Sequence, residues 1–213
     1  MRKLLRVIIP VVVIAAVAML VLNFTSGKEK GAKKNTQADE HLCCSDAGEG
    51  VISENSIYQL SSQWTNQEGE AVSLISFRGK PVVLTMFYTS CTYACPLLVN
   101  DMRKIESSLP VEKRDDYKFV LVSIDPERDT PAKLKLYAKD HGLDLSRWTL
   151  LTGKSDDIME LAALTGFKYK KDDKGSYSHS NLITLLNVKG EIAHQQTGLN
   201  QDAVETVNQL KNL

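Results

Sequence analysis

The chain has 213 residues, 26 basic and 26 acidic side chains, 43% hydrophobic residues and four cysteines. This length suits one well-cored domain with appendages, and the composition is that of a globular protein rather than a disordered one. A net charge of zero excludes a typical nucleic-acid-binding protein. Four cysteines are too few for a disulfide scaffold, and their grouping into two pairs points to chemistry or metal binding.

The amino terminus is predicted to be a membrane anchor. Residues 1–6 include three basic side chains, and the 18 residues 7–24 are uncharged and almost wholly apolar. As a helix, residues 7–24 would rise about 27 Å, close to the hydrocarbon thickness of a bilayer. The basic flank should stay in the cytoplasm. We therefore expect a single-pass signal anchor at 1–24 in a bacterial inner (cytoplasmic) membrane, with the rest of the chain on the periplasmic side.

A cleaved signal peptide is the alternative, because Ala16, Val17 and Ala18 form a small-residue pattern of the kind at which signal peptides are cut. The apolar run continues past this point, which favours the uncleaved anchor.

Residues 25–55 are predicted to be a flexible tether, since they are rich in Lys, Gly, Glu, Ser and Asp and poor in apolar residues. They contain His41, Cys43 and Cys44. Adjacent cysteines beside a histidine can bind a soft metal, can form a disulfide, or can be incidental on a linker. The sequence leaves these alternatives open.

Residues 56–213 are predicted to be the domain, beginning with a hairpin and continuing with strands and helices in alternation. The hairpin strands are expected at 58–60 and 71–74, with a turn at 66–69. Apolar runs without alternation predict strands buried on both faces, at 82–88, 119–124 and 148–151. A helix is expected after each run, and a second hairpin (182–186 and 191–194) and a last helix near 203–210 complete the chain.

Local signals place the ends of the helices. The helix after the cysteines should end near Leu109, where its apolar repeat stops. The next should begin with Thr130 as N-cap and Pro131 in its first turn, and should bury Leu134, Leu136 and Tyr137. Gly166 should end the third.

This order predicts an α/β fold with a central, mostly parallel sheet and an antiparallel edge, and the thioredoxin-like fold matches it best. Open α/β sheets form their sites beyond the carboxyl ends of the parallel strands. Cys91 and Cys95, after the run 82–88, are expected there. The loop 125–129, after the run 119–124, is expected at the same edge.

Cys91 and Cys95 are candidates for redox chemistry or for metal binding. A spacing of four residues on a helical turn would put their Cβ atoms about 5–6 Å apart. Modest adjustment would allow a disulfide, and the open pair could hold one metal ion as two thiolates. A helix N-terminus favours the thiolate in either case. A static disulfide or inert buried thiols are the structural alternatives.

Two features favour metal binding over ordinary thiol redox chemistry. Thioredoxin-like oxidoreductases separate their cysteines by two residues, whereas three lie between these. Those enzymes also carry a proline before the strand that faces the cysteines, where this chain has Ser178, His179 and Ser180. Two thiolates and one imidazole suit copper, and zinc would accept them as well. His141 and His194 are not expected to face the thiols.

Three segments together resemble the Sco/SenC family: YTSCTYACP at 88–96, VSIDPERDTP at 122–131 and SHS at 178–180. The resemblance extends from about residue 57 to 210. It implies a membrane-tethered, thioredoxin-like copper protein that serves assembly of the binuclear copper centre of cytochrome c oxidase. It also implies that the copper ligands are Cys91, Cys95 and His179, with Asp125 as an acidic residue behind the ligands or facing a partner. Many members of the family carry aspartate where this chain has Ser178.

We therefore expect a copper-binding protein that delivers or prepares Cu(I) or Cu(II) for a terminal oxidase. Its expected partners are the copper-bearing subunit of cytochrome c oxidase and, in addition, other copper chaperones or thioredoxin-like reductants. The alternative is a thiol–disulfide oxidoreductase that reduces the copper-site cysteines of the oxidase. That activity would need the redox-active pair Cys91 and Cys95 but not His179.

Overall fold

A computed structural model of the chain describes residues 52–213. The predicted anchor (1–24), most of the predicted tether (25–55) and the pair Cys43 and Cys44 lie outside this range. Among the described residues, no helix combines the length and the apolar character that a membrane span requires. The division into anchor, tether and domain therefore stays a prediction.

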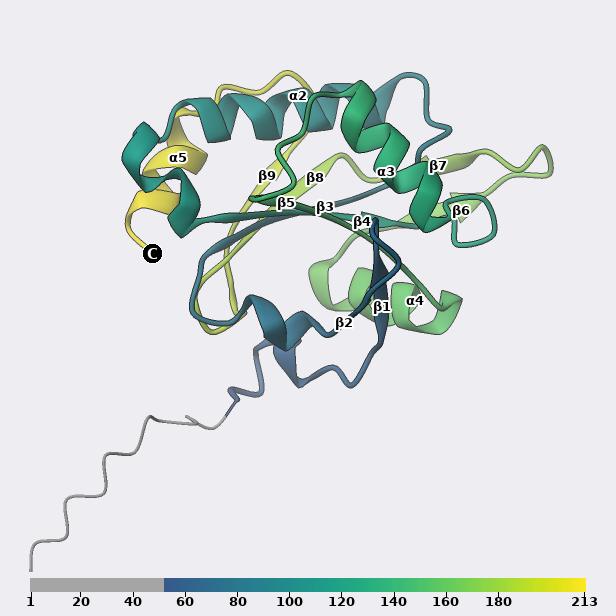
Figure 1. Cartoon of the computed structure of the whole chain (residues 1–213), viewed down its shortest axis with the longest axis horizontal. Coiled ribbons are helices and arrows are strands. Elements are labelled where there is room, and N and C mark those ends of the chain that lie inside the picture. The colour runs from purple at the N-terminus through teal and green to yellow at the C-terminus, as the bar shows by residue number, and fades with distance from the viewer. Residues whose placement is uncertain (1–51) are drawn as a thin grey trace, which may run out of the picture. The chain divides into compact units, whose positions relative to one another are not determined.

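The centre of the fold is a seven-stranded sheet with the strand order β2-β1-β5-β4-β3-β8-β9 (Figure 1). Its middle strands run parallel: β3 (Val82–Phe87), β4 (Lys118–Ser123) and β5 (Trp148–Gly153). The outer strands pair antiparallel on both sides: β1 (Trp64–Asn66), β2 (Ala71–Val72), β8 (Leu182–Leu186) and β9 (Ile192–Thr197). The sheet is thus parallel at its centre and antiparallel at both edges, where the sequence predicted one antiparallel edge.

Helices cover both faces of this sheet. The helices α2 (Ala94–Ser107) and α3 (Pro131–Asp140) lie on one face, and α4 (Ser155–Thr165) lies on the other (Figure 1). Right-handed crossovers explain this arrangement, because β3, β4 and β5 advance in one direction and place α2 and α3 on the same side. The last helix, α5 (Val204–Lys211), packs beside β9.

The sequence signals for strand burial and helix ends are confirmed. Every residue of β3 is buried, as its unbroken apolar run predicted. Thr130 caps α3, since its side chain accepts a hydrogen bond from the Lys133 N–H at 3.4 Å, and Pro131 is the first helical residue. Gly166 adopts the left-handed conformation, with φ of 70°, that closes α4.

The predicted strand at 58–60 is wrong. The chain forms a short 3-10 helix there, η1 (Ile57–Gln59), because the Ser56 hydroxyl accepts a hydrogen bond from the Tyr58 N–H at 3.1 Å and caps it. The hairpin is instead formed by β1 and β2. Its predicted turn at 66–69 is confirmed, with Asn66 Oδ1 accepting two backbone hydrogen bonds and Gly69 at φ of 83°.

The predicted burial of Leu136 is also wrong, because its side chain is 55% exposed. The inward face of α3 is formed by Leu134, Tyr137 and Ala138. A helix turns by about 100° per residue, so a position two residues from Leu134 points away from the core. Two further 3-10 helices are η2 (Leu74–Phe77), which lies between β2 and β3, and η3 (Val111–Asp116), which lies between α2 and β4.

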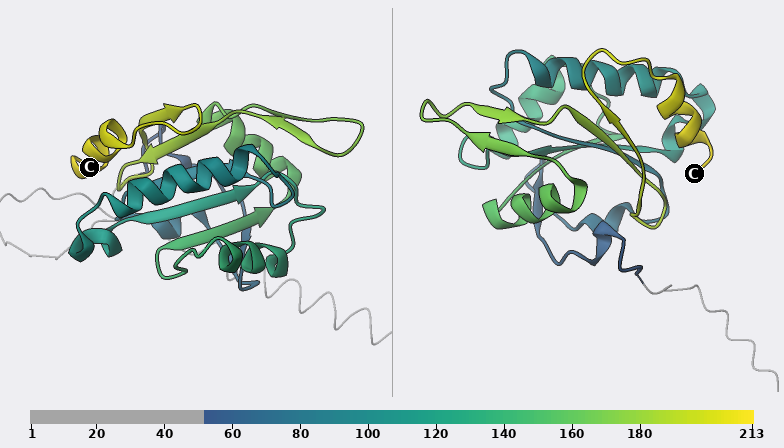
Figure 2. Two further views of the ribbon diagram at one scale, coloured as in Figure 1. Left: turned by 90° about the horizontal axis from the view of Figure 1, so that it is seen from above. Right: turned by 180° about the vertical axis from the view of Figure 1, so that it is seen from behind.

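The strands β6 (Tyr169–Lys171) and β7 (Tyr177–His179) form a separate two-stranded ribbon that the sequence did not predict. The ribbon projects past the end of the sheet at which β3 and β4 finish (Figures 1 and 2). The Lys, Asp, Gly and Ser residues between 168 and 180 are typical of a loop, so the sequence carries no strand signal here. The ribbon places His179 beside the corner between β3 and α2.

The turn at Gly190 gives a test of the packing. Gly190 has φ of 80°, and a Cβ atom there would lie 2.5 Å from the buried ring of Tyr58. We expect Gly190→Ala to lower the free energy of unfolding by roughly 2–4 kcal/mol, measured by chemical denaturation, because the backbone is strained and the ring must move. Gly142→Ala is the matched control: it has φ of 60° with no atom within 4 Å of its Cβ. Equal losses in the two variants would contradict this account.

Candidate metal centre

The two thiols lie at the corner between β3 and α2. Both are free, Cys95 is buried and Cys91 is partly exposed. The helix begins only at Ala94, so Cys91 lies in the preceding loop rather than on the same helical turn as Cys95, which the spacing had predicted. The Cys95 N–H donates a hydrogen bond to Cys91 Sγ at 3.4 Å. The sulfur of Cys91 therefore lies at the N-terminus of α2, where negative charge is stabilised.

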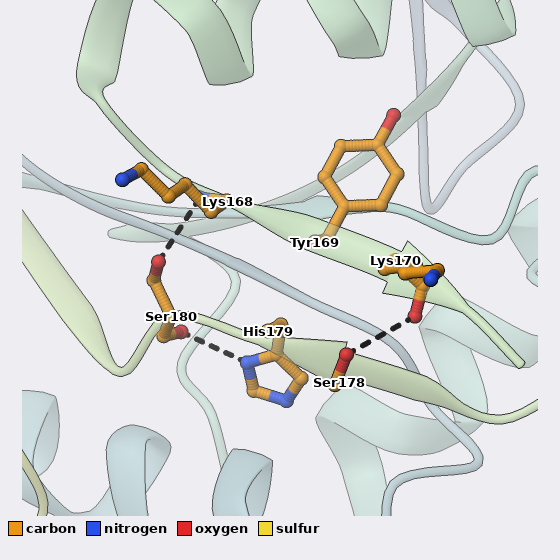
Figure 3. Close-up of a pocket in the computed structure, with 6 residues that line it drawn as sticks. All are labelled: Lys168, Tyr169, Lys170, Ser178, His179 and Ser180. Atoms are coloured by element: carbon orange, nitrogen blue, oxygen red, sulfur yellow. Dashed lines mark hydrogen bonds between the residues drawn. The ribbon is translucent and has the colours of Figure 1, made fainter.

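The ribbon brings the imidazole of His179 to these sulfurs. Its Nε2 lies 3.9 Å from Cys91 Sγ and 3.6 Å from Cys95 Sγ. Its Nδ1 lies 2.9 Å from the carbonyl oxygen of Ser180 (Figure 3). A carbonyl can only accept, so Nδ1 carries the proton, and Nε2 faces the sulfurs, where it shares a proton with a thiolate or binds a metal ion.

The spacing of these three donor atoms fits one metal ion. The two sulfurs and the nitrogen all lie within 4.8 Å of one another. Metal bonds of about 2.3 Å to sulfur and 2.0 Å to nitrogen, as zinc makes them, would separate S from N by roughly 3.7 Å in a trigonal site. The measured S–N distances of 3.6 and 3.9 Å lie on either side of that value. Within residues 52–213, this is the one group of three His, Cys, Asp or Glu side chains with such geometry.

The two thiols differ in acidity. A hydrogen bond from the Cys95 thiol lowers the pKa of Cys91 well below its usual range. Contacts with His179 and with the backbone at Cys95 and Tyr93 lower this pKa further, whereas burial raises it. The same hydrogen bond, together with burial, raises the pKa of Cys95. The metal-free pair therefore holds one thiolate, on Cys91, with Cys95 as its proton donor.

Aromatic rings fix the imidazole from two sides. The ring of Phe167 stacks on His179 with centroids 5.9 Å apart, and Tyr88 approaches it edge-on at 5.9 Å. Tyr88 also packs against Tyr177 at 5.2 Å. These contacts restrict rotation of the ring and shield one side of the donor group from water.

A buried carboxylate that sequence reasoning did not single out holds the thiol loop. Asp129 is fully buried, and its Oδ2 accepts hydrogen bonds from the Thr89 N–H at 3.0 Å and the Ser123 hydroxyl at 2.6 Å. Its Oδ1 accepts from the Thr89 hydroxyl at 2.5 Å. Thr89 precedes Cys91 by two residues, so Asp129 ties the thiol loop to the end of β4. The sequence shows two aspartates four residues apart and gives no signal that separates their roles.

Asp125, which the resemblance had singled out, is fully buried just after β4. Its carboxylate pairs with Arg128 Nε and accepts a hydrogen bond from the Tyr177 hydroxyl at 3.5 Å. It contacts the ribbon rather than the donor atoms. As expected, His141 and His194 do not belong to the donor group: His141 stacks on a tyrosine at the end of α3, and His194 lies in the edge strand β9.

Comparison with known proteins points to one family. The profile of the family described as SCO1/SenC matches residues 53–213. The SCO1 protein homolog of Bacillus subtilis is 30% identical over 137 residues, which cover 63% of this chain and 70% of that protein. A SCO1/SenC family lipoprotein from Bacillus anthracis has a solved structure that matches with 28% identity and a TM-score of 0.65, over 71% of this chain and 91% of that one. The copper-bound structure of ScoI from Bradyrhizobium japonicum matches with 26% identity and a TM-score of 0.58, over 71% and 96%.

The lowered pKa of Cys91 predicts an unusual pH profile. In the reduced, metal-free protein, alkylation of Cys91 by iodoacetamide should slow by less than about threefold between pH 8 and pH 5, because the thiolate persists on acidification. An ordinary thiol slows about tenfold per pH unit in this range. Peptide mass mapping measures the rate at each cysteine. In Cys95→Ala, which removes the largest of these contributions, the dependence on pH should become steeper; an ordinary dependence in the wild type would refute the assignment.

The role of Asp129 predicts a local effect and a global one. Asp129→Ala leaves three donors without their acceptor, so the free energy of unfolding should fall by roughly 2–4 kcal/mol. The Thr89 amide should exchange its hydrogen faster. Asp125→Ala is the matched control, since it removes a buried carboxylate from the same loop without touching Thr89. Unchanged exchange at Thr89 in Asp129→Ala would show that this carboxylate does not hold the thiol loop.

Proposed function

The chain belongs to the SCO1/SenC family, and from this premise we propose that it binds one copper ion through Cys91, Cys95 and His179. We further propose that it delivers or prepares this copper for the binuclear copper centre of cytochrome c oxidase.

The convergence of two sulfurs and one imidazole nitrogen carries the proposal. Soft thiolates hold Cu(I), and the imidazole also accommodates Cu(II). The copper-bound ScoI of Bradyrhizobium japonicum, whose structure matches over 71% of this chain, supports copper as the metal. The hydrogen bond from Nδ1 to Ser180 supports the ligand role of His179, because it leaves Nε2 for the metal.

Three protein ligands suit a site that must give its metal away. Cys91 and His179 are partly exposed, whereas Cys95 is buried, so an acceptor would approach on the Cys91 and His179 side. Two acceptor thiols that replace these ligands bind Cu(I) as thiolates. Of the two protons that they lose, one is taken up by Cys95 and the other passes to solvent, because Cys91 stays a thiolate in the metal-free pair, and charge is conserved.

The proposed place of this chemistry is the periplasmic side of a bacterial inner membrane, with residues 1–24 as the anchor. The uncharged run 7–24 and the likeness to a family lipoprotein support a membrane-attached domain outside the cytoplasm. The proposed partners are the copper-bearing subunit of the oxidase, other copper chaperones and thioredoxin-like reductants.

One observation favours a second function, that of a thiol–disulfide oxidoreductase acting on the copper-site cysteines of the oxidase. The Cys91 thiolate is a nucleophile, and Cys95 lies behind it, placed to resolve a mixed disulfide. In that reaction the Cys91 and Cys95 thiols are oxidised to a disulfide while a partner disulfide takes up the two electrons and two protons. Exchange of this kind does not require His179.

Copper titration tests the proposal. In a Cys43→Ser/Cys44→Ser background, the protein should bind about one equivalent of Cu(I) in competition with a chromophoric chelator. Cys91→Ser should lower the affinity by more than about 100-fold, since it removes a ligand rather than a residue behind one. His179→Ala should change the Cu(II) spectrum, because the nitrogen ligand is lost.

His194→Ala is the matched control, since it removes an imidazole from the edge strand and should leave both measurements unchanged. The copper proposal is wrong when the wild-type site takes up no copper, or when His179→Ala leaves both the affinity and the spectrum as they were. Rapid exchange with a disulfide peptide of the oxidase site, insensitive to His179→Ala, would favour the oxidoreductase.

A further inference from the structure

The donor His179 belongs to a part of the fold that the main sheet does not hold. The ribbon of β6 and β7 is a sheet of its own, and its backbone ladder pairs only these two strands. The thiols, in contrast, are attached to β3 at the centre of the seven-stranded sheet. The position of His179 relative to the sulfurs therefore depends on side-chain contacts that fasten the ribbon.

Arg128 makes the contact that reaches the far end of the ribbon. It lies in the loop after β4, and its Nη2 donates a hydrogen bond to the carbonyl oxygen of Gly175 in the ribbon turn. A Cβ atom at Gly175 would lie 3.8 Å from Arg128 Nη1, so the guanidinium rests directly against this turn. The turn itself is rigid, because Asp172 Oδ1 accepts hydrogen bonds from two of its amides, at 2.9 and 2.8 Å.

Asp125 fixes the direction of the guanidinium. Its Oδ2 accepts from Arg128 Nε, and its Oδ1 accepts from the Tyr177 hydroxyl on β7. Asp125 is fully buried at the end of β4, so the pair joins the ribbon to the same strand that anchors the thiol loop. A guanidinium can serve a carboxylate and a carbonyl at once because its N–H groups point in fixed directions.

We propose that Arg128 is a positioning residue for His179, which it holds at the thiols by clamping the ribbon turn to the buried Asp125. This inference rests on the proposed function only in naming copper as the metal. Without the clamp, the ribbon keeps its strands and its covalent ends but loses its fixed angle to the sheet. The site then changes from three ligands to two thiolates.

The two oxidation states of copper respond differently to that change. Two thiolates satisfy Cu(I), whereas Cu(II) depends on the nitrogen ligand. Arg128→Gln should therefore lower the Cu(II) affinity by about 10–100-fold, the range for residues that hold a ligand in place. The Cu(I) affinity should fall by less than about threefold. The Cu(II)/Cu(I) potential should rise by about 59 mV for each factor of ten by which the Cu(II) affinity falls more than the Cu(I) affinity.

The experiment uses the full-length protein with Cys43→Ser/Cys44→Ser, in detergent. Chelator competition measures both affinities. Electron paramagnetic resonance of promptly frozen Cu(II) samples measures nitrogen coupling, which should weaken in Arg128→Gln as we expect it to weaken in His179→Ala. In the metal-free protein, exchange of the Tyr177 amide should accelerate at least about tenfold, since its acceptor, the Tyr88 hydroxyl at 3.4 Å, lies outside the ribbon and separates from it when the ribbon moves. Arg128→Lys should be intermediate, because one ammonium cannot serve Asp125 and Gly175 with the geometry of a guanidinium.

Lys171→Gln is the matched control, because it removes another ion pair of the ribbon, the solvent-exposed bridge of 2.7 Å from Lys171 to Glu127. Exposed bridges contribute little, so this variant should leave all readouts unchanged. The inference is overturned when Arg128→Gln keeps the wild-type amide exchange, or when His179→Ala loses Cu(II) affinity and Arg128→Gln does not. Failure of the wild type to bind copper would overturn the proposed function alone, since the exchange measurement needs no metal. Equal effects of Arg128→Gln and Lys171→Gln would also contradict the specific role of Arg128.

Discussion

Two buried carboxylates, four residues apart in the loop after β4, hold the candidate metal centre together. Asp129 accepts three hydrogen bonds and ties the thiol loop to β4 through Thr89. Asp125 pairs with Arg128, which reaches the turn of the ribbon that carries His179. A buried carboxylate without partners is costly, so each fixes the groups that satisfy it. The thiol loop and the ribbon, which carry the donor atoms, are thus both fastened to the end of β4.

The asymmetry of the two thiols follows from where α2 begins. Because the helix starts between them, Cys91 lies outside it with its sulfur at the helix N-terminus, and Cys95 lies inside it, buried. The two thiols share one proton, and Nε2 of His179 faces their sulfurs. The same arrangement favours a metal ion in place of that proton and favours nucleophilic attack by Cys91. The two proposed activities, copper binding and thiol exchange, would therefore use one geometry.

Much of the candidate site could be predicted from the sequence. The thiols follow an unbroken apolar run, and His179 occupies the place where related oxidoreductases have a proline, so the donor set was identified without coordinates. The roles of Asp125 and Asp129 could not be assigned, because two carboxylates in one loop look alike until burial and partners are known. The role of Arg128 could not be predicted either, since the residue that it contacts, Gly175, lies 47 residues away along the chain.

The sequence by itself determined the buried strands and the ends of the helices, because these depend on local periodicity, capping and turn chemistry. It also indicated the three donor residues of the candidate metal centre, through the place of His179 in the predicted topology and the resemblance of three segments to one family. Only the tertiary structure decided the ribbon of β6 and β7, the 3-10 helix at Ile57–Gln59 and the exposure of Leu136. The ribbon is stabilised by aromatic contacts and by the hydrogen bond from Arg128 to Gly175, both with distant segments, and its own sequence favours a loop. Local preference cannot specify an element whose stability comes from partners far along the chain.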